Sequence, residues 1–489
     1  MLSKRNAPVE MQGAEFKQTG YRLIDQIAEF LDNICRKPVT VDLSSAQLSA
    51  IIGRHPVPEH GKSASEIVSN AADLLLNYSL LNGHPRFQGY ITSSAAPIGA
   101  LADLLAAAVN PNVGAHILSP VATAIEMQVI KWLGSFIGLP ACFDGILVSG
   151  GNMANFTAFF AAINAKIPNC KEEGISGAAA RVVIYCSRTT HTWIEKAAAL
   201  SGLGTRSIRW IPPDSANKID IVILKKTIQE DQKNGLLPIM VIGTAGDVST
   251  GAVDDLKSIA AICKQHDCWF HIDGAYGLPA AVVPEQRELF EGMADADSIA
   301  LDPHKWLYSP LEAGCTLVRD PNHLVQTYSS HPVYYNFNTD DQPETRNFYE
   351  YGFQNSRGFR ALKVWMVLQQ AGRQGFMEMI SADIKLAGLL FRLASQHAEL
   401  QAISNNLSIT TLRYCPPGYA EGNLNKLNEL LLNDLQRSGE LFFSNAVIAD
   451  KYCLRACFVN FRTAEKDVEE MVEIIVRRGR KMAEFIEST

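Results

Sequence analysis

The sequence has no hydrophobic run long enough to cross a membrane. Its most apolar stretch, residues 97–109, is interrupted by Asp103 and is shorter than the ~20 residues that a spanning helix needs. The N-terminus carries charged residues and glutamine where a secretory signal would need an apolar core. We therefore expect no membrane partner and a cytoplasmic location.

A strong excess of one charge is also lacking. The net charge is −7 over 489 residues, which gives no basic surface for nucleic acid. The ten cysteines are scattered, and the two close pairs, Cys263/Cys268 and Cys453/Cys457, do not have zinc-finger spacing. Reduced and mostly buried thiols are therefore expected. What remains is a protein of ordinary globular composition that handles small molecules.

The order of apolar patterns divides the chain into three segments. Residues 1–85 have helical spacing and a capping-box pattern at Ser63 and Glu66. An apolar stripe in this segment favours core packing or a subunit contact; it consists of Leu23, Ile24, Ile27, Phe30, Leu31 and Ile34. Residues 376–489 mix possible strands at 407–412 and 454–459 with a final amphipathic helix around 468–475, which predicts a small α+β domain.

The middle segment, residues 86–375, alternates short apolar runs with helical stretches. The runs that predict strands are residues 146–148, 182–185, 239–242, 269–272, 298–301 and 316–318. This alternation predicts an α/β domain with a large, mostly parallel sheet covered by helices. Because ligands of such sheets bind at the carboxyl ends of the strands, the polar residues after each run are the first candidates for a site.

Two of these strand ends carry groups that can hold an anion or a ring. After the first run, Gly150 and Gly151 precede Asn152 and a helical stretch, so backbone N–H groups can approach a phosphate there. After the run at 269–272, Asp273 can keep a ring nitrogen protonated, and Ala275 is small enough for a flat ring to lie against it. Each pattern alone also fits a simple turn without a ligand.

Two further strand ends carry a histidine and a lysine. His191 follows the run at 182–185 and can stack on a planar cofactor. Lys305 lies between His304 and Trp306 in an apolar context, where a lysine is unusual. A Schiff base explains it, because the covalent bond replaces the ammonium group. An isolated surface lysine and a structural histidine remain the alternatives for each residue taken singly.

The conjunction of these groups, in order along one sheet, matches the needs of pyridoxal 5'-phosphate. The glycine turn can bind the phosphate, His191 can stack on the ring, Asp273 can protonate the pyridine nitrogen and Lys305 can form the imine. Four weak signals in a consistent order thus predict one cofactor.

The same stretches resemble the group II pyridoxal-phosphate-dependent amino acid decarboxylases, which include aromatic-L-amino-acid and glutamate decarboxylases. The resemblance extends over nearly the whole chain and is carried by residues 84–87, 150–155, 271–277, 302–306, 357–363 and 454–456, with His191 and Asn460. It implies a type I aminotransferase-like fold, a large cofactor-binding domain, a helical N-terminal segment that contacts the partner, and a homodimer with shared active sites.

The resemblance also implies roles for single residues. Lys305 is similar to the Schiff-base lysine, and His304 to the histidine that precedes it. Gly151 and Asn152 fall where the family binds the phosphate. Tyr334 matches a tyrosine on a mobile loop, with Tyr335 as the alternative register.

The remaining roles concern the ring: Asp273 resembles the partner of the ring nitrogen, and His191 and Ala275 resemble the residues on its two faces. The reaction implied is decarboxylation of an L-amino acid to the amine and CO2 through a quinonoid intermediate, with Tyr334 as the acid and His191 or His304 assisting. An aromatic substrate is slightly preferred over an acidic one.

Two regions depart from the family pattern. Asp247 stands where relatives usually have threonine, and a second carboxylate facing the cofactor beside Asp273 would disfavour ionisation of both. A displaced turn is the alternative. Residues 91–93 and 112–116 lack the aromatic wall of the aromatic-amino-acid enzymes, which predicts a wider and more polar pocket.

Four other functions remain open. With the same cofactor, the chain could be an aldehyde synthase or a transaminase, although a tyrosine at position 334 favours decarboxylation. A metal-dependent hydrolase could use His271, Asp273, Asp302 and His304 as ligands, but it leaves Lys305 unexplained. A non-catalytic homologue would have little reason to retain Lys305, Asp273 and Tyr334.

Overall fold

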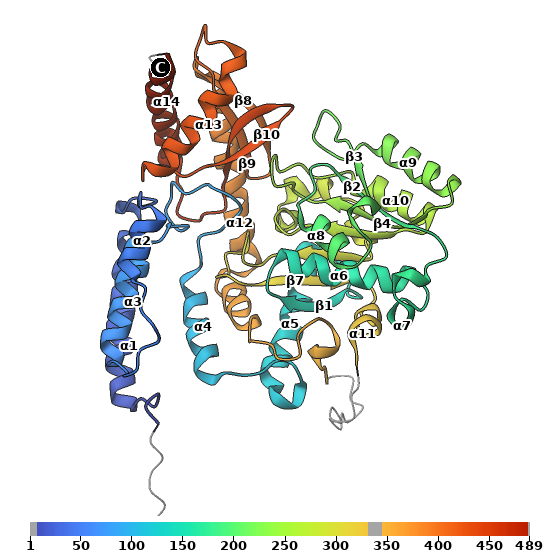
Figure 1. Cartoon of the computed structure of the whole chain (residues 1–489), viewed down its shortest axis with the longest axis horizontal. Helices are drawn as coiled ribbons and strands as arrows, with labels where there is room; N and C mark the ends of the chain where they lie inside the picture. Colours follow the sequence, from blue (N-terminus) through green and yellow to red (C-terminus); the bar gives the residue numbers. More distant parts are fainter. Residues whose placement is uncertain (1–6, 331–344, 488–489) are drawn as a thin grey trace, which may run out of the picture.

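A computed structural model describes residues 7–330 and 345–487 of the chain. The N-terminal part is helical, as predicted, with α1 Gly13–Asn33, α2 Ser45–Ile52 and α3 Ala64–Tyr78. Helices α1 and α3 pack together in an arm beside the rest of the molecule (Figure 1). Ser63 caps α3 by accepting from the backbone N–H of Glu66. The reciprocal capping box is formed instead at α2, by Ser44 and Gln47.

Within the described residues, seven strands form a large sheet in the order β1-β7-β6-β5-β4-β2-β3. Their bounds are β1 Asp144–Val148, β2 Val182–Ser187, β3 Ile208–Ile211, β4 Leu237–Thr244, β5 Trp269–Asp273, β6 Ser298–Leu301 and β7 Gly314–Val318. Strand β7 runs antiparallel to both β1 and β6, and the other pairs are parallel. The expected α/β domain with a mostly parallel sheet is confirmed, and β3 is a strand that the sequence did not reveal.

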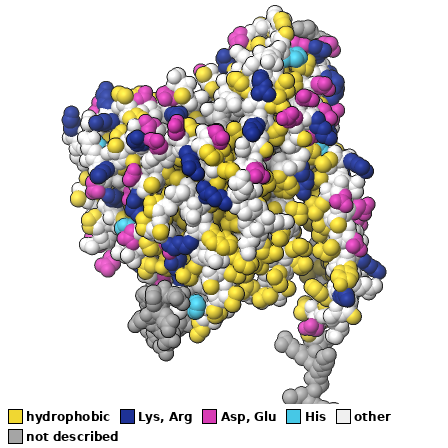
Figure 2. Space-filling view, turned by 180° about the vertical axis from the view of Figure 1, so that it is seen from behind, with side chains coloured by type: hydrophobic (Ala, Val, Ile, Leu, Met, Phe, Trp, Pro, Cys, Tyr) yellow, Lys and Arg dark blue, Asp and Glu magenta, His cyan; other side chains and the backbone are white. Residues whose placement is uncertain are grey.

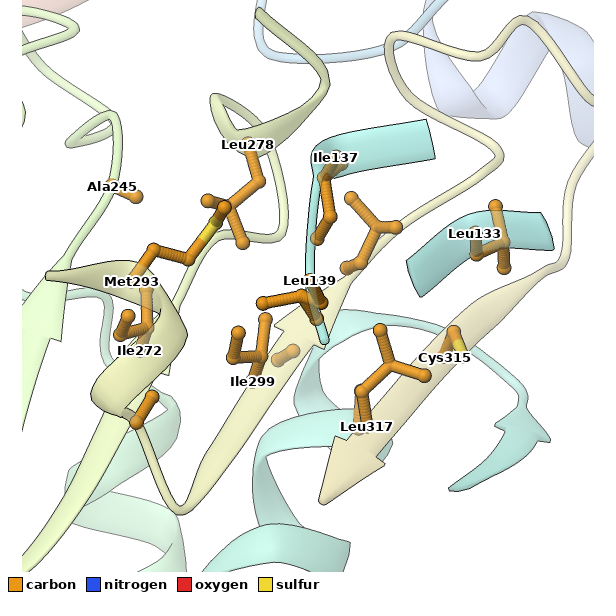
Figure 3. Close-up of a cluster of buried hydrophobic side chains, with 14 of the residues drawn as sticks. Leu133, Ile137, Leu139, Ala245, Ile272, Leu278, Met293, Ile299, Cys315 and Leu317 are labelled. Carbon is orange, nitrogen blue, oxygen red and sulfur yellow. The ribbon is translucent and has the colours of Figure 1, made fainter. Parts of the chain in front are cut away.

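Helices cover this sheet on both faces, and α5, α6, α9 and α10 pack directly on its strands. The helices of this part of the chain are α4 Pro97–Val109, α5 Pro120–Ile137, α6 Gly151–Lys166, α7 Cys170–Glu173, α8 Trp193–Leu200, α9 Ile221–Lys233, α10 Leu256–His266 and α11 Asn322–Tyr328. Proline at the first position and Gly138 in a left-handed C-cap set the ends of α5. Leu133 and Ile137 of α5 pack against sheet residues such as Ile299 and Leu317 (Figure 3). This core holds the strand ends in fixed positions.

The C-terminal part is an antiparallel sheet with helices. Its described strands follow the order β10-β11-β9-β8 and are β8 Leu400–Asn406, β9 Ile409–Tyr414, β10 Ser444–Ile448 and β11 Lys451–Cys457, with α13 Glu421–Arg437 and α14 Glu465–Glu487. The expected strand at 407–412 is wrong at its start, because Leu407 and Ser408 form the turn between β8 and β9. Leu407 has a left-handed backbone (φ 46°), which its apolar side chain does not signal.

The long helix α12 Ala361–Gln396 connects the two parts (Figure 1). It packs on α4 and α5 at one end and on β8, β9 and α14 at the other. Its helical geometry is interrupted at Gly372 (φ 63°, ψ 170°), so the predicted division at residue 375 falls close to this break and inside the helix. The three-segment division stays a prediction. Among the described helices, none has the length and apolarity that crossing a membrane requires.

Candidate active site

The strand ends that carry the predicted site residues meet at one edge of the large sheet. Because β7 is antiparallel to both its neighbours, β1 points in the same direction as β6, β5, β4 and β2. A cavity of about 710 Å³ opens at their carboxyl ends. Its lining includes every predicted cofactor residue: Gly151, Asn152, His191, Asp273, Ala275, His304 and Lys305. The structure thus brings together residues from four separate strand ends.

The N-terminus of α6 forms one wall of this cavity. Gly150 precedes the helix with φ 145°, a backbone conformation that favours glycine. A Cβ on Gly151 would lie 2.5 Å from Oδ2 of Asp302, so this approach also requires glycine. No side chain of the described residues caps the helix. Its first N–H groups are therefore available to an anion, which fits a phosphate group.

Asp273 is fixed by two hydrogen bonds at the end of β5. Nε1 of Trp193 donates to Oδ2 at 2.8 Å, and the backbone N–H of Ala275 donates to Oδ1 at 3.3 Å. The carboxyl group is largely buried but still lines the cavity. It is thus an oriented acceptor, which fits a protonated ring nitrogen.

Lys305 makes an ion pair with Asp302 inside the same turn. Its Nζ lies 2.9 Å from Oδ2 of Asp302, whose side chain is only 1% exposed. Within the described part of the chain, the Asp302 carboxylate oxygens have no hydrogen-bond partner, so the ion pair with Lys305 is their main polar contact. The Lys305 side chain retains 20% exposure and lines the cavity, so its amine is held at the cavity wall while remaining accessible to a ligand.

Two histidines line the cavity in an environment that favours their neutral form. Partial burial lowers the pKa of His191, and the nearby Asp273 opposes this shift. Burial likewise lowers the pKa of His304, against the effect of Asp302. Nδ1 of His304 lies 2.7 Å from the carbonyl oxygen of Ala313. Neutral imidazoles can stack on a ring or relay a proton.

Asp247, which departs from the family pattern, lies in a turn. Its carboxylate accepts from the backbone N–H groups of Ser249, Thr250 and Ala252 and from the Thr250 hydroxyl. It does not line the cavity. The hypothesis that Asp247 faces the cofactor beside Asp273 is therefore wrong. Tyr334 and Tyr335 lie outside the described residues.

The four residues considered as ligands of a metal-dependent hydrolase, among them His271, do not form a metal site within the described residues. The ring nitrogens of His271 are engaged, Nε2 by Asn155 at 2.7 Å and Nδ1 by Ser298 at 2.8 Å. Burial lowers the pKa of His271 to about 4. Over residues 7–330 and 345–487, no group of three or more His, Cys, Asp or Glu side chains converges on a possible metal position.

The sequence did not predict the residues that hold the cavity-lining side chains in place. Trp193 orients Asp273 from 80 positions away in the chain, and Asn155 links the Gly151 carbonyl to His271. The sequence suggests Asp302 only as a possible metal ligand, although its spacing of three from Lys305 across a turn is a signal for the ion pair. The Trp193 contact depends on the tertiary fold.

Comparison with a solved structure defines the class of the fold. Oryza sativa TDC, determined with PLP and tryptamine, superposes with a TM-score of 0.90 at 24% identity, covering 98% of this chain and 100% of that one. The expected type I aminotransferase-like fold of pyridoxal-phosphate enzymes is therefore confirmed.

Sequence comparison then gives the family. The pyridoxal-dependent decarboxylase conserved domain matches residues 51–412. The chain is 32% identical over 471 residues to an aromatic-L-amino-acid decarboxylase of Bacillus atrophaeus, with 96% of each covered. It is 26% identical over 479 residues to a phenylacetaldehyde synthase of a Rosa hybrid cultivar, with 94% of this chain and 93% of the relative covered. The chain belongs to the pyridoxal-dependent decarboxylase family.

The family membership establishes the chain as a carboxy-lyase that uses pyridoxal phosphate. The residues present fit this cofactor. The uncapped end of α6 suits its phosphate, the oriented Asp273 suits its ring nitrogen, and the accessible Lys305 suits its aldehyde.

Proposed function

We propose that this enzyme decarboxylates an L-amino acid to the amine and CO2, with an aromatic substrate preferred over an acidic one. The observation that carries the proposal is the convergence of Lys305, Asp273, His191 and the N-terminus of α6 on one cavity. When bound there, pyridoxal phosphate supplies an electron sink for the electron pair of the bond between Cα and the carboxylate.

The protein groups have distinct tasks in this proposal. Lys305 would hold the cofactor covalently through its amine, which would be free again once the substrate amine takes its place. Gly151 and Asn152 hold the phosphate with the N–H groups of α6. Asp273, oriented by Trp193, pairs with the ring nitrogen. His191 and Ala275 contact the two faces of the ring.

After CO2 leaves, a proton must reach Cα. We assign this proton to the hydroxyl of Tyr334, with His191 or His304 assisting. The pKa of each histidine is lowered mainly by burial, so each is neutral near pH 7 and can accept a proton as well as relay one. A loop that closes over the cavity would exclude water at this step.

The walls of the cavity support the substrate preference. Apolar side chains of Ile91, Met153, Val248 and Leu311 line it, which suits an aromatic ring. Glu312 also lines the cavity, so the acidic side chain of a substrate would be repelled by a like charge. The ion pair of Glu312 with Arg360, at 2.9 Å, weakens this repulsion. The relative from Bacillus atrophaeus is named for aromatic substrates.

A homodimer with shared active sites is part of the proposal. Helix α4 exposes Leu101, Leu104, Leu105 and Val109 by 51–69% at the spacing of one helix face. Hydrophobic side chains gather across the lower central part of the face in Figure 2. Monomeric proteins rarely expose such a patch, and a second copy of the chain is the occupant that we propose.

We also propose a cytoplasmic location. All ten cysteines are free, including the close pair Cys263 and Cys268. Free thiols in this number are typical of a reducing compartment. Cell fractionation with an antibody to the chain tests this, and recovery from a secreted or membrane fraction would contradict it.

A second candidate is aldehyde synthesis, which the similarity to the Rosa phenylacetaldehyde synthase favours. Transamination is the other reaction that the same cofactor allows. The products separate the three: amine and CO2 without O2 uptake for decarboxylation, aldehyde, CO2, ammonia and peroxide with O2 consumed for aldehyde synthesis, and a keto-acid requirement for transamination.

The test of the proposed function is CO2 release from single amino acids by the holoenzyme. The panel contains phenylalanine, tyrosine, tryptophan, glutamate and aspartate. We expect CO2 and one equivalent of amine, with higher kcat/KM for an aromatic member. Absence of CO2 from every member, with cofactor bound, would refute the proposal; a preference for glutamate would refute only the substrate class.

A further inference from the structure

The two segments that carry Asp273 and Lys305 are joined by a stacked pair of aromatic rings. Tyr276 follows Asp273 by three residues, and Trp306 follows Lys305 directly. Their ring centroids lie 5.0 Å apart with planes at 13°, and both side chains are almost fully buried. A shift of either segment would therefore be transmitted to the other through this pair.

Both members of the aromatic pair are hydrogen-bonded to residues of the C-terminal part of the chain. Trp306 Nε1 donates to Oδ2 of Asp383 at 2.8 Å, and Asp383 lies on α12. The hydroxyl of Tyr276 lies 2.5 Å from Oγ of Ser408 and accepts from the Ser408 backbone N–H at 3.0 Å. Ser408 lies in the turn between β8 and β9.

A third contact fixes the end of the Lys305 turn. Tyr308 has a left-handed backbone (φ 54°), which a bulky residue adopts only where its surroundings hold it there. Its hydroxyl donates a short hydrogen bond to the same Oδ2 of Asp383. Its backbone N–H donates to the Lys305 carbonyl at 3.1 Å. Asp383 thus holds both ends of the segment from Trp306 to Tyr308.

We propose that Asp383 and Ser408 are positioning residues, which set the placement of Lys305 relative to Asp273 through Trp306, Tyr308 and Tyr276. Neither Asp383 nor Ser408 lines the cavity, so each acts through these aromatic side chains. The inference rests on the roles proposed above for Lys305 and Asp273. It makes the contact between α12 and the turn that carries Lys305 part of the working site.

The test compares Asp383→Ala with Asp383→Asn in the holoenzyme. The alanine variant loses two hydrogen bonds to a carboxylate, so we expect kcat to fall about 10- to 100-fold with KM for the amino acid unchanged. The pH midpoint of the visible band of the cofactor should move from its wild-type value. Asp383→Asn should restore most of the wild-type kcat and pH midpoint, because its amide oxygen can accept from both Trp306 and Tyr308.

Ser408→Ala provides a second variant if Asp383→Ala does not fold. This variant loses the hydroxyl contact but keeps the backbone N–H bond to Tyr276, so kcat should fall only about 2- to 10-fold. The pH midpoint of the visible band should again move from its wild-type value. Asn428→Ala is the matched control. Asn428 is fully buried in the C-terminal part and bonds to Tyr414 and Leu424, so its loss should lower thermal stability without moving kcat or the pH midpoint.

Two results would overturn the inference. One is an Asp383→Ala or Ser408→Ala enzyme with lower thermal stability but wild-type kcat and pH midpoint. The other is an Asn428→Ala control that changes kcat and the pH midpoint as much as Asp383→Ala does. If the wild-type band did not depend on Lys305 at all, the proposed function would fail and this inference with it.

Discussion

At the scale of single residues, the hydrogen bond from Trp193 to Asp273 is the contact most open to test. Trp193 is fully buried and its indole N–H donates at 2.8 Å. Because a hydrogen bond to a charged group contributes about 1.5–3 kcal/mol, we expect Trp193→Phe to weaken cofactor binding roughly 10- to 100-fold. Equilibrium titration of the apoenzyme with pyridoxal phosphate measures this.

Trp269→Phe is the control for that variant. Trp269 is also buried, but its indole N–H donates to the neutral hydroxyl of Ser298 at 2.7 Å. The control should lose stability while keeping wild-type cofactor affinity. Equal affinity losses in both variants would show that Trp193 acts only through packing.

Tyr334 decides the outcome of the reaction in this account. Tyr334→Phe removes the proposed acid, so in the presence of O2 the products should shift from amine toward aldehyde, peroxide and ammonia, while CO2 is still released. Chromatography of amine and aldehyde, with a peroxide assay, measures the ratio. Tyr335→Phe is the neighbouring control and should leave the amine yield unchanged; the reverse pattern would move the assignment to Tyr335.

The sequence predicted the cavity residues better than their supports. Gly151, Asp273 and Lys305 lie at the ends of strands or within four residues after them, and parallel strands bring their ends together. Trp193 could not be predicted to reach Asp273, because that contact depends on how α8 packs against β5. The orientation of Asp247 depends on a local turn, which the residue type alone does not specify.

At the scale of elements, buried strands were predictable and partly exposed ones were not. Strands β4, β5 and β6 are buried at nearly every position, and β6 has the predicted bounds. Strand β3 is buried only at its two ends, and β10 alternates buried and exposed positions, so neither has a distinctive apolar pattern. Their positions are set by the neighbouring strands instead.

Helix α12 carries a pH dependence of stability through Asp383. Burial raises the pKa of Asp383 from its ordinary 3.8 to about 7. Between these values the folded chain retains a proton that the unfolded chain has lost, so stability falls as the pH rises from about 4 to about 7 and the contribution is then constant.

Asp383→Asn removes this contribution. Relative to the variant, the wild type should therefore lose up to a few kcal/mol of unfolding free energy across this pH range, at about 1.4 kcal/mol per pKa unit. Urea denaturation at pH 4.5, 6 and 8 measures the difference. A difference that is independent of pH would contradict the raised pKa.

At the scale of the whole molecule, the exposed face of α4 predicts a dimer. Leu104 lies on this face and is 51% exposed. In a symmetric dimer, Leu104→Asp removes two leucines and adds two carboxylates to the interface, so the dissociation constant should rise at least about 100-fold. Sedimentation velocity measures it, and activity should fall with dimer content.

Leu200→Asp is the matched control for the interface. Leu200 ends α8 and is 74% exposed, away from α4. This variant should remain dimeric and active. A wild-type chain that sediments as a monomer at micromolar concentration while retaining full activity would contradict shared active sites.

The proposed reaction depends on the bond between Lys305 and the cofactor. The most direct measurement is borohydride reduction of the holoenzyme, followed by proteolysis and mass spectrometry, with Lys305→Ala as the control. We predict that the visible band disappears, that the pyridoxyl mass is found on the peptide containing Lys305, and that the control has native circular dichroism without the label. A label on another lysine, or a Lys305→Ala enzyme that still decarboxylates at the wild-type rate, would contradict the account.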